Sequence, residues 1–144
     1  MKNLTYTQID GTASYEDMMA CAELMAERLW NADVDTRAEA MMARWSDHIF
    51  MLLKDEINSP VAYYSGEIRN HTTLELFDLF VLPQKRRLGI ATQALNHART
   101  TYRKYNCDRI EFAVGTQDSE LYKIAYEALY AFEKAPDDSL VAVF

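Results

Sequence analysis

Hydrophobic and polar positions change their period along the chain, and each change marks a predicted element. Residues 4–9 alternate as in a strand, which ends at Asp10 and Gly11. Ser14 and Asp17 then give a helix-start signal, and apolar residues recur at helical spacing to about residue 30. A second helix is predicted over residues 36–47, and its apolar side is formed by Ala38, Met41, Met42 and Trp45.

From residue 48 onward the pattern favours strands. Residues 49–53, 61–68 and 72–81 are strand-like runs separated by short turns, which predicts an antiparallel meander. A helix follows from Ile90 to about residue 105, and a strand at residues 109–114 should lie parallel to the strand before that helix. A last helix from Asp118, with Phe132 on its inward side, and a terminal strand at residues 140–144 complete the order β-α-α-β-β-β-α-β-α-β.

The composition fits a single domain that spans residues 1–144. Hydrophobic residues make up 49% of the chain and charged residues 26%, an ordinary balance for a globular protein. Residues 1–20 lack a secretory signal pattern, and no run approaches the ~18 apolar residues of a membrane span. We therefore expect a cytoplasmic protein without a membrane partner. The cysteines and histidines show no metal-ligand spacing, so no metal is expected.

The net charge of −7 narrows the choice of partner. It argues against nucleic acid, because neutralising many phosphates needs a broad basic surface. Against this acidic background the consecutive basic residues Lys85, Arg86 and Arg87 are a local exception. A small positive patch on an acidic protein suggests a compact polyanion as ligand.

The basic residues lie in a stretch that joins a predicted strand to a predicted helix. The strand run at residues 74–81 ends near Pro83, which cannot donate a hydrogen bond to a sheet ladder. Gly89 then precedes the helix. The first backbone N–H groups of a helix have no internal partner and favour negative charge, and a glycine lets a phosphate approach them closely. The stretch therefore predicts an anion site.

The spacing within this stretch is more specific. Residues 86–91, Arg-Arg-Leu-Gly-Ile-Ala, resemble the acyl-CoA pyrophosphate signature of the GNAT N-acetyltransferase superfamily, Gln/Arg-x-x-Gly-x-Gly/Ala. Residues 79–83, Leu-Phe-Val-Leu-Pro, resemble that family's central strand and its exit. Together with the order of elements, the resemblance covers essentially the whole chain. Length and order, with Arg-Leu-Trp at residues 28–30, most resemble small aminoglycoside 6′-N-acetyltransferases.

The resemblance implies an α+β (mixed α/β) fold with a three-layer, GNAT-like arrangement. The implied sheet is mixed and mostly antiparallel, has about six or seven strands, and is flanked by about four helices. It is splayed between its fourth and fifth strands, and acetyl-CoA, the cosubstrate, lies in the splay. The implied cofactor-binding residues are Leu79, Phe80, Val81, Arg86, Arg87, Leu88, Gly89, Ile90, Ala91 and Thr92.

Acetyl transfer to an amine needs a base, because a lysine-like amine has a pKa of ~10.4. Glu75 matches the position of the base in some lysine acetyltransferases of the family. Strict alternation places it on the same strand face as Leu79, where partial burial would raise its pKa. Asp78, on the other face, could orient a cationic substrate instead, and Glu111 is a third candidate. A solvent-facing acid at a strand end is the plain alternative.

The departing thiolate benefits from a proton donor, which in many family members is a tyrosine on the last helix. The family pattern of that helix is degenerate here, and Tyr126 is the only tyrosine in the window where the pattern places one. Tyr126 also shares a helix face with Tyr122 and Tyr130, so the stripe could simply pack or face a partner. Aminoglycoside-type relatives often lack this tyrosine.

In this fold the first two helices and the loop before the final strand form the acceptor groove. The resemblance therefore implies acids on both sides of the groove: Asp33, Asp35, Glu39 and Asp47 on one side, and Asp137 and Asp138 on the other. Such acids raise the local concentration of a cationic substrate, although a solvated acidic face is the alternative. We expect an N-acetyltransferase acting on a primary amine of a small cationic molecule or a lysine side chain, by direct attack in a ternary complex. The chain is expected to be a monomer or homodimer, and a catalytically silent acyl-CoA-binding or interaction module is the alternative function.

Overall fold

The structure, a computed structural model, describes residues 3–28, 33–112, 132–134 and 140–143. Its elements follow one another in the order predicted for the first two thirds of the chain. They are β1 (Thr5–Gln8), α1 (Tyr15–Arg28), α2 (Val34–Arg44), β2 (Ile49–Lys54), β3 (Pro60–Arg69), β4 (Thr73–Val81), a short 3-10 helix (Pro83–Lys85), α3 (Ile90–Arg103), β5 (Arg109–Phe112), β6 (Phe132–Lys134) and β7 (Leu140–Val143).

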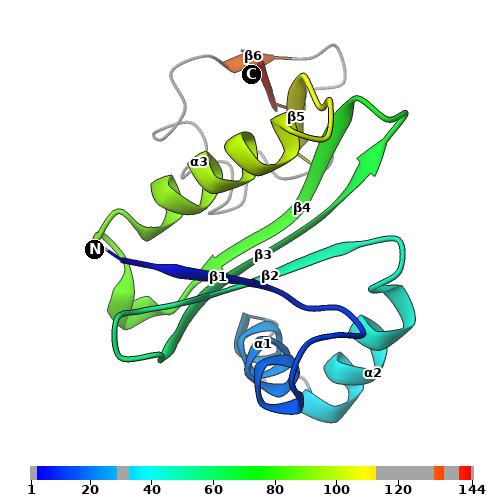
Figure 1. The fold of residues 1–144 in the computed structure, drawn as a ribbon. Coiled ribbons are helices and arrows are strands. Elements are labelled where there is room, and N and C mark those ends of the chain that lie inside the picture. Colours follow the sequence, from blue (N-terminus) through cyan, green and yellow to red (C-terminus); the bar gives the residue numbers. More distant parts are fainter. Residues whose placement is uncertain (1–2, 29–32, 113–131, 135–139, 144) are drawn as a thin grey trace.

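The described strands form one sheet between two layers of helices. Its strand order is β1-β2-β3-β4-β5-β7-β6. Neighbouring strands are antiparallel except β4 and β5, which run parallel, as expected for strands joined through α3. Helices α1 and α2 cover one face of the sheet and α3 covers the other (Figure 1). The predicted α+β class with a mixed sheet is confirmed; the predicted last helix lies outside the described residues.

Both N-terminal helices begin at residues that cap them. The Ser14 hydroxyl accepts a hydrogen bond from the Asp17 N–H at 3.1 Å, as the helix-start signal predicted. The Asp33 carboxylate accepts one from the Asp35 N–H at 2.9 Å, so α2 begins at Val34, earlier than the apolar spacing indicated. Each cap satisfies an N–H group that has no partner within its helix.

Two hydrophobic clusters hold the layers together. One joins Leu74, Leu76, Leu79 and Val81 of β4 to the apolar side of α3. The other joins strand residues such as Leu52 and Phe80 to buried residues of α1 and α2. The apolar side chains of β4 therefore pack against both helix layers, some against α3 and others against α1 and α2. This packing determines which layer each polar side chain of β4 faces.

A β-bulge interrupts this alternation in β4. Ser65 of β3 pairs with Asp78, but the next residue, Gly66, pairs with Leu76, so Phe77 is the extra residue on β4. A bulge of this kind reverses the alternation beyond it and re-aims the side chains on either side. As a result Leu76 and Leu79 lie on the same face, although they are separated by an odd number of positions.

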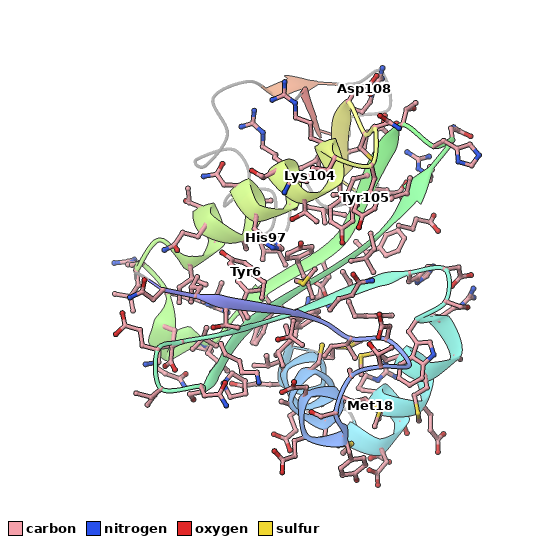
Figure 2. All side chains as sticks on the ribbon, in the orientation of Figure 1. Tyr6, Met18, His97, Lys104, Tyr105 and Asp108 are labelled. Atoms are coloured by element: carbon pink, nitrogen blue, oxygen red, sulfur yellow. The ribbon has the colours of Figure 1, made fainter. Side chains whose placement is uncertain are left out.

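On the α3 face, an aromatic and polar cluster secures the edge strand β1. The Tyr6 ring stacks on the His97 ring of α3 with their centroids 3.7 Å apart (Figure 2). The His97 Nδ1 lies 3.0 Å from the Tyr64 hydroxyl oxygen. Burial lowers the pKa of His97, which favours its neutral form and thus a nitrogen able to accept from Tyr64.

One sequence expectation about the C-terminal part is wrong. Phe132 was expected on the inward side of the last helix, but Phe132–Lys134 is strand β6 and pairs antiparallel with β7. The terminal strand lies between β5 and β6, because β7 pairs with both of them. Periodicity alone could not separate such a short strand from the end of a helix.

The bulge yields a prediction about stability. A Cβ added at Gly66 would lie 2.3 Å from the Glu75 carbonyl oxygen, which is backbone and cannot move aside. Gly66→Ala should therefore lower the free energy of unfolding by about 1–3 kcal/mol in urea denaturation. Gly11→Ala is the matched control, because nothing lies within 4 Å of its added Cβ. Equal unfolding midpoints for the two variants would contradict the bulge geometry.

Candidate active site

The end of β4 presents backbone groups that β3 does not use. The Leu82 N–H donates to the Val61 carbonyl at 2.9 Å. Since hydrogen-bonded and non-bonded pairs alternate along an antiparallel ladder, the pair Tyr63–Phe80 is bonded, while Leu79 and Val81 point their N–H and C=O groups away from β3. On that side, β5 pairs with β4 only from Thr73 to Leu76 in the described residues.

The N-terminus of α3 directly follows this strand end. Gly89 is its N-cap, in the left-handed region at φ 79°, and no side chain caps the helix. The first intrahelical bond runs from the Gln93 N–H to the Gly89 carbonyl at 3.0 Å, so the N–H groups of residues 90–92 precede the helical ladder. Nothing lies within 4 Å of a Cβ built at Gly89. This open cradle fits a phosphate group.

The basic residues before α3 differ in their contacts. The Lys85 Nζ lies 4.0 Å from Asp55 Oδ2. Arg86 lies with its guanidinium over the Phe80 ring, and its Nε donates to the Val81 carbonyl at 3.0 Å. Arg87 is exposed and has a left-handed backbone at φ 65°. The three residues directly precede the cradle in the chain, and positive charge near a helix N-terminus favours an anion there.

Asp78 projects from β4 toward the α1 and α2 layer and is held on both carboxylate oxygens. Oδ1 lies 2.5 Å from the Arg28 Nε at the end of α1, and Oδ2 accepts a hydrogen bond from the Tyr63 hydroxyl. Burial raises the pKa of Asp78, while Tyr63, Arg28 and the Leu79 N–H act in the opposite direction. The carboxylate thus lies beside the backbone of the strand end that β3 does not use.

Glu75 does not lie where alternation predicted. Because of the bulge, it lies opposite Leu74, Leu76 and Leu79, which pack toward α3, so the expected shared face with Leu79 is wrong. Its Oε2 lies 2.5 Å from the Arg69 Nε. The same guanidinium contacts Glu111 Oε2 through its Nη2. Glu75 and Glu111 are therefore neighbours in the parallel ladder and share one arginine.

The remaining predicted residues have separate positions. Asp33 and Asp35 are both exposed at the start of α2, where Asp33 also caps the helix. Tyr126, Asp137 and Asp138 lie outside the described residues. Sequence reasoning missed Arg69 and Tyr63, because their contacts arise from cross-strand register rather than from local pattern.

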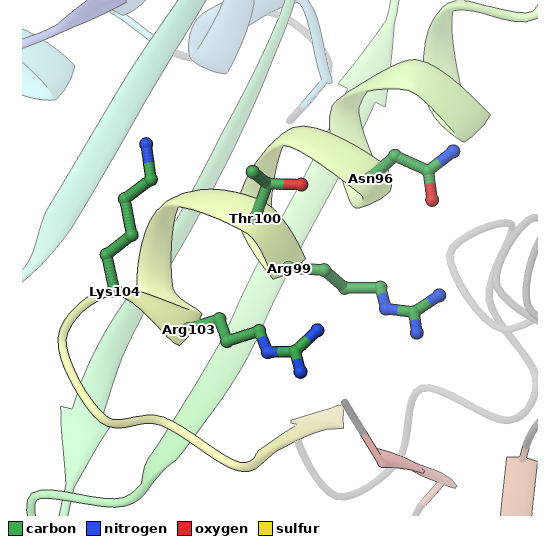
Figure 3. A pocket seen from close by; sticks show the side chains of 5 residues that line it. All are labelled: Asn96, Arg99, Thr100, Arg103 and Lys104. Atoms are coloured by element: carbon green, nitrogen blue, oxygen red, sulfur yellow. The ribbon is translucent and has the colours of Figure 1, made fainter.

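A hollow of about 570 Å³ lies against the outer side of α3. In the described residues it is lined by Asn96, Arg99, Thr100, Arg103 and Lys104 (Figure 3). Arg99 and Arg103 are one helical turn apart and point to the same side. At a rise of about 1.5 Å per residue, the lining residues lie roughly 10 Å (Asn96) to 20 Å (Arg103) along the helix from Gly89, so the hollow begins about two turns beyond the cradle.

The described fold is a mixed sheet between two helix layers, with an open cradle where the end of β4 leads into α3. The family model described as "Acetyltransferase (GNAT) family" matches residues 14–126. The chain therefore belongs to the GNAT family of acetyltransferases. No curated protein matches the chain.

Solved structures share the fold over nearly their whole length. An aminoglycoside 6′-N-acetyltransferase from Acinetobacter baumannii has a TM-score of 0.71 at 20% identity, covering 92% of this chain and 93% of that one. Tetrahymena GCN5 has a TM-score of 0.71 at 9% identity, covering 96% and 95%. Spermidine N-acetyltransferase from Vibrio cholerae, in complex with CoA and spermine, has a TM-score of 0.70 at 14% identity, covering 96% and 92%. At these identities the likeness establishes the fold.

In the described part of the chain, no helix has the length and apolar character needed to cross a membrane. The same residues contain no group of at least three histidines, cysteines or carboxylates arranged to hold a metal ion.

The cradle predicts the effect of a side chain at Gly89. Gly89→Val forces a β-branched residue into the left-handed region and places its methyl groups where a phosphate would approach. The Kd for CoA, measured by calorimetry, should rise at least about tenfold. Arg99→Ala, at the separate hollow, should leave that Kd unchanged. Unaltered CoA affinity in a folded Gly89→Val variant would refute the cradle.

Proposed function

We propose that this protein transfers an acetyl group from acetyl-CoA to a primary amine by direct attack in a ternary complex. The observation that carries the proposal is that the outward Leu79 carbonyl and Val81 N–H lie next to the uncapped N-terminus of α3. The other two outward groups are already in contact within the chain, the Leu79 N–H with Asp78 and the Val81 carbonyl with Arg86. A pantetheine arm can hydrogen-bond to the end of β4 as an added strand does. A pyrophosphate can bind the N–H groups at the start of α3, as anions do at helix N-termini. When bound, acetyl-CoA supplies the acetyl group as an activated thioester.

Glu75 is the proposed base. Its Oε2 contacts Arg69, whereas no contact of Oε1 is found in the described residues, so one oxygen can accept a proton from the incoming amine. Both oxygens of Asp78 are already engaged, by Arg28 and Tyr63. Glu75 is also partly shielded, with 20% of its side chain exposed. Asp78, on the same face of the sheet as Glu75, is the proposed positioning residue for the acceptor. Glu111 lies beside Glu75, where it contacts Arg69.

The remaining catalytic roles fall on the strand backbone and the last helix. A backbone N–H that points out from the open end of β4 is placed to stabilise negative charge on the acetyl oxygen. Tyr126 is the proposed proton donor for the departing sulfur, and water is the alternative donor. The proton removed from the amine goes to Glu75, the new bond joins the amine nitrogen to the acetyl carbon, and the carbon–sulfur bond breaks.

The proposed acceptor is a cationic amine. Glu67, Glu75 and Glu111 occupy one row across β3, β4 and β5, and Asp33 and Asp35 are exposed at α2. Carboxylates around an amine site attract positive substrates and raise their local concentration. The similar proteins named above, which include spermidine and aminoglycoside acetyltransferases, support the same class of acceptor without identifying it.

The base assignment can be tested by following release of the free CoA thiol with a panel of polyamines, aminoglycosides and lysine peptides. Glu75→Gln should lower kcat by roughly 10²–10⁴ because it removes the proton acceptor and keeps the shape. Asp78→Asn, the matched comparison on the same strand, should act mainly on KM. If kcat of Glu75→Gln stays within about threefold of wild type, the assignment is wrong. If no amine releases thiol from a CoA-binding protein, the chain is an acyl-CoA-binding module instead.

Acceptor recognition by α2 can be tested separately. Asp33→Asn with Asp35→Asn should raise KM for a polyamine and flatten its dependence on salt, because two screened charges are lost. Asparagine is also a good N-cap, so α2 should be retained. The charge-matched control is Glu56→Gln with Asp108→Asn, two exposed acids away from α2. The same KM and salt slope in both double variants would exclude the α2 acids from recognition.

A further inference from the structure

We propose that Arg69 is a positioning residue, which holds Glu75 in place and negatively charged by bridging it to Glu111. This inference rests on the proposed role of Glu75 as base. Arg69 acts through Glu75. Its guanidinium group, at the end of β3, contacts one glutamate of β4 and one of β5, in the region where these two strands are paired.

The contacts identify Arg69 as a two-way bridge. The Nε lies 2.5 Å from Glu75 Oε2, and the Nη2 contacts Glu111 Oε2. The Nε is shielded from solvent although 41% of the side chain is exposed. The Nη2 donates a hydrogen bond to Glu111, whereas the Nε contact with Glu75 is an ion pair without hydrogen-bond geometry in the described residues. Arg69 therefore sets the distance of Glu75, and both the distance and the direction of Glu111.

A hydrogen-bonded turn directly after Arg69 holds the backbone of this residue in place. Arg69 is the last residue of β3, and the turn that follows contains Asn70 and His71 in the left-handed region, at φ 53° and 61°. The Thr72 N–H donates to the Arg69 carbonyl at 3.2 Å and closes the turn. The Arg69 side chain is therefore attached to a tight hairpin and not to a long loop, which restricts its position relative to Glu75.

The two glutamates that Arg69 contacts belong to a row of carboxylates that repel one another. Glu67 pairs with Glu75, and Glu75 pairs with Glu111, so three carboxylates lie side by side across three strands. Opposite residues of neighbouring strands have their Cβ atoms only about 4.5–5.5 Å apart. Carboxylates at that spacing repel one another, and the proton affinity of one of them rises unless a cation lies between them.

The other groups facing this row can be named. His48 Nε2 lies 3.5 Å from Glu67 Oε2, and the His48 ring also contacts the Phe77 ring of β4. Arg109, two residues before Glu111 on the same face of β5, has its Nε 3.3 Å from Asp108. Farther along the same face, Arg28 and Asp78 neutralise each other. Arg69 is therefore the cation, in the described residues, that contacts both Glu75 and Glu111. Its removal leaves the base beside a second uncompensated carboxylate.

The test is the pH dependence of kcat/KM. In Arg69→Met the acid limb should move to higher pH by about one unit, because an opposite charge at this distance ordinarily shifts a carboxyl group by 1–3 units and solvent screens part of it. Arg69→Lys keeps the charge and should keep the limb near its wild-type position, with a lower kcat from lost alignment. Arg44→Met, at an exposed pair with Asp47, is the control and should change nothing.

A second carboxylate variant separates electrostatics from a general loss of structure. Adding Glu111→Gln to Arg69→Met should return the limb toward wild type, and Glu111→Gln alone should move it to lower pH. A carbon-13 NMR titration of Glu75 in the free protein should show the same order of midpoints without any turnover. If Arg69→Met does not fold, the Glu111→Gln shift and the titration still decide the question.

The outcomes distinguish this inference from the proposed function. An unmoved limb in folded Arg69→Met, or a double variant that does not return toward wild type, overturns the role of Arg69 while leaving Glu75 as base. Full activity of Glu75→Gln removes the base and this inference with it. Loss of kcat in Glu75→Gln together with the expected limb shifts supports both.

Discussion

Backbone hydrogen-bonding groups at the end of β4 are the constraint on which the site depends. The parallel neighbour β5 pairs with β4 from Thr73 to Leu76, and the N–H and C=O groups of Leu79 and Val81 point away from β3 farther along. The Leu79 N–H contacts the Asp78 carboxylate and the Val81 carbonyl accepts from Arg86, which leaves the Leu79 carbonyl and the Val81 N–H to pair with water, another strand or a ligand. The uncapped start of α3 places a second set of donors in line with them. In the proposed function, these two sets of groups bind the amides and the phosphates of one extended cofactor.

The bulge at Phe77 connects this receptor to the acid–base chemistry. It lets β4 pack apolar residues toward α3 both before and after Phe77, and it turns Glu75 and Asp78 to the other layer. Gly66 makes the bulge possible, since its backbone comes too close to Glu75 for a side chain. The fold thus separates the proposed cofactor side, which consists of backbone groups and a helix terminus, from the proposed acceptor side, which consists of carboxylates.

Much of the fold and the candidate phosphate site could be predicted from the sequence, because these features depend on residues close together in the chain. The meander, the helix caps, Pro83 at the strand exit and Gly89 before α3 each follow from residue type and spacing. The face of Glu75 could not be predicted, because a bulge depends on the register between two strands. The bridge by Arg69 and the pairing of β6 with β7 depend on contacts between residues far apart in the sequence, which periodicity does not encode.

A crystal structure with CoA bound tests the central claim most directly. We expect pantetheine amides hydrogen-bonded to the Leu79 carbonyl and the Val81 N–H, the pyrophosphate on the N–H groups of residues 90–92, and the sulfur beside the face that carries Glu75 and Asp78. CoA bound instead at the basic hollow of Arg99 and Arg103, with the β4 backbone groups still facing water, would contradict it.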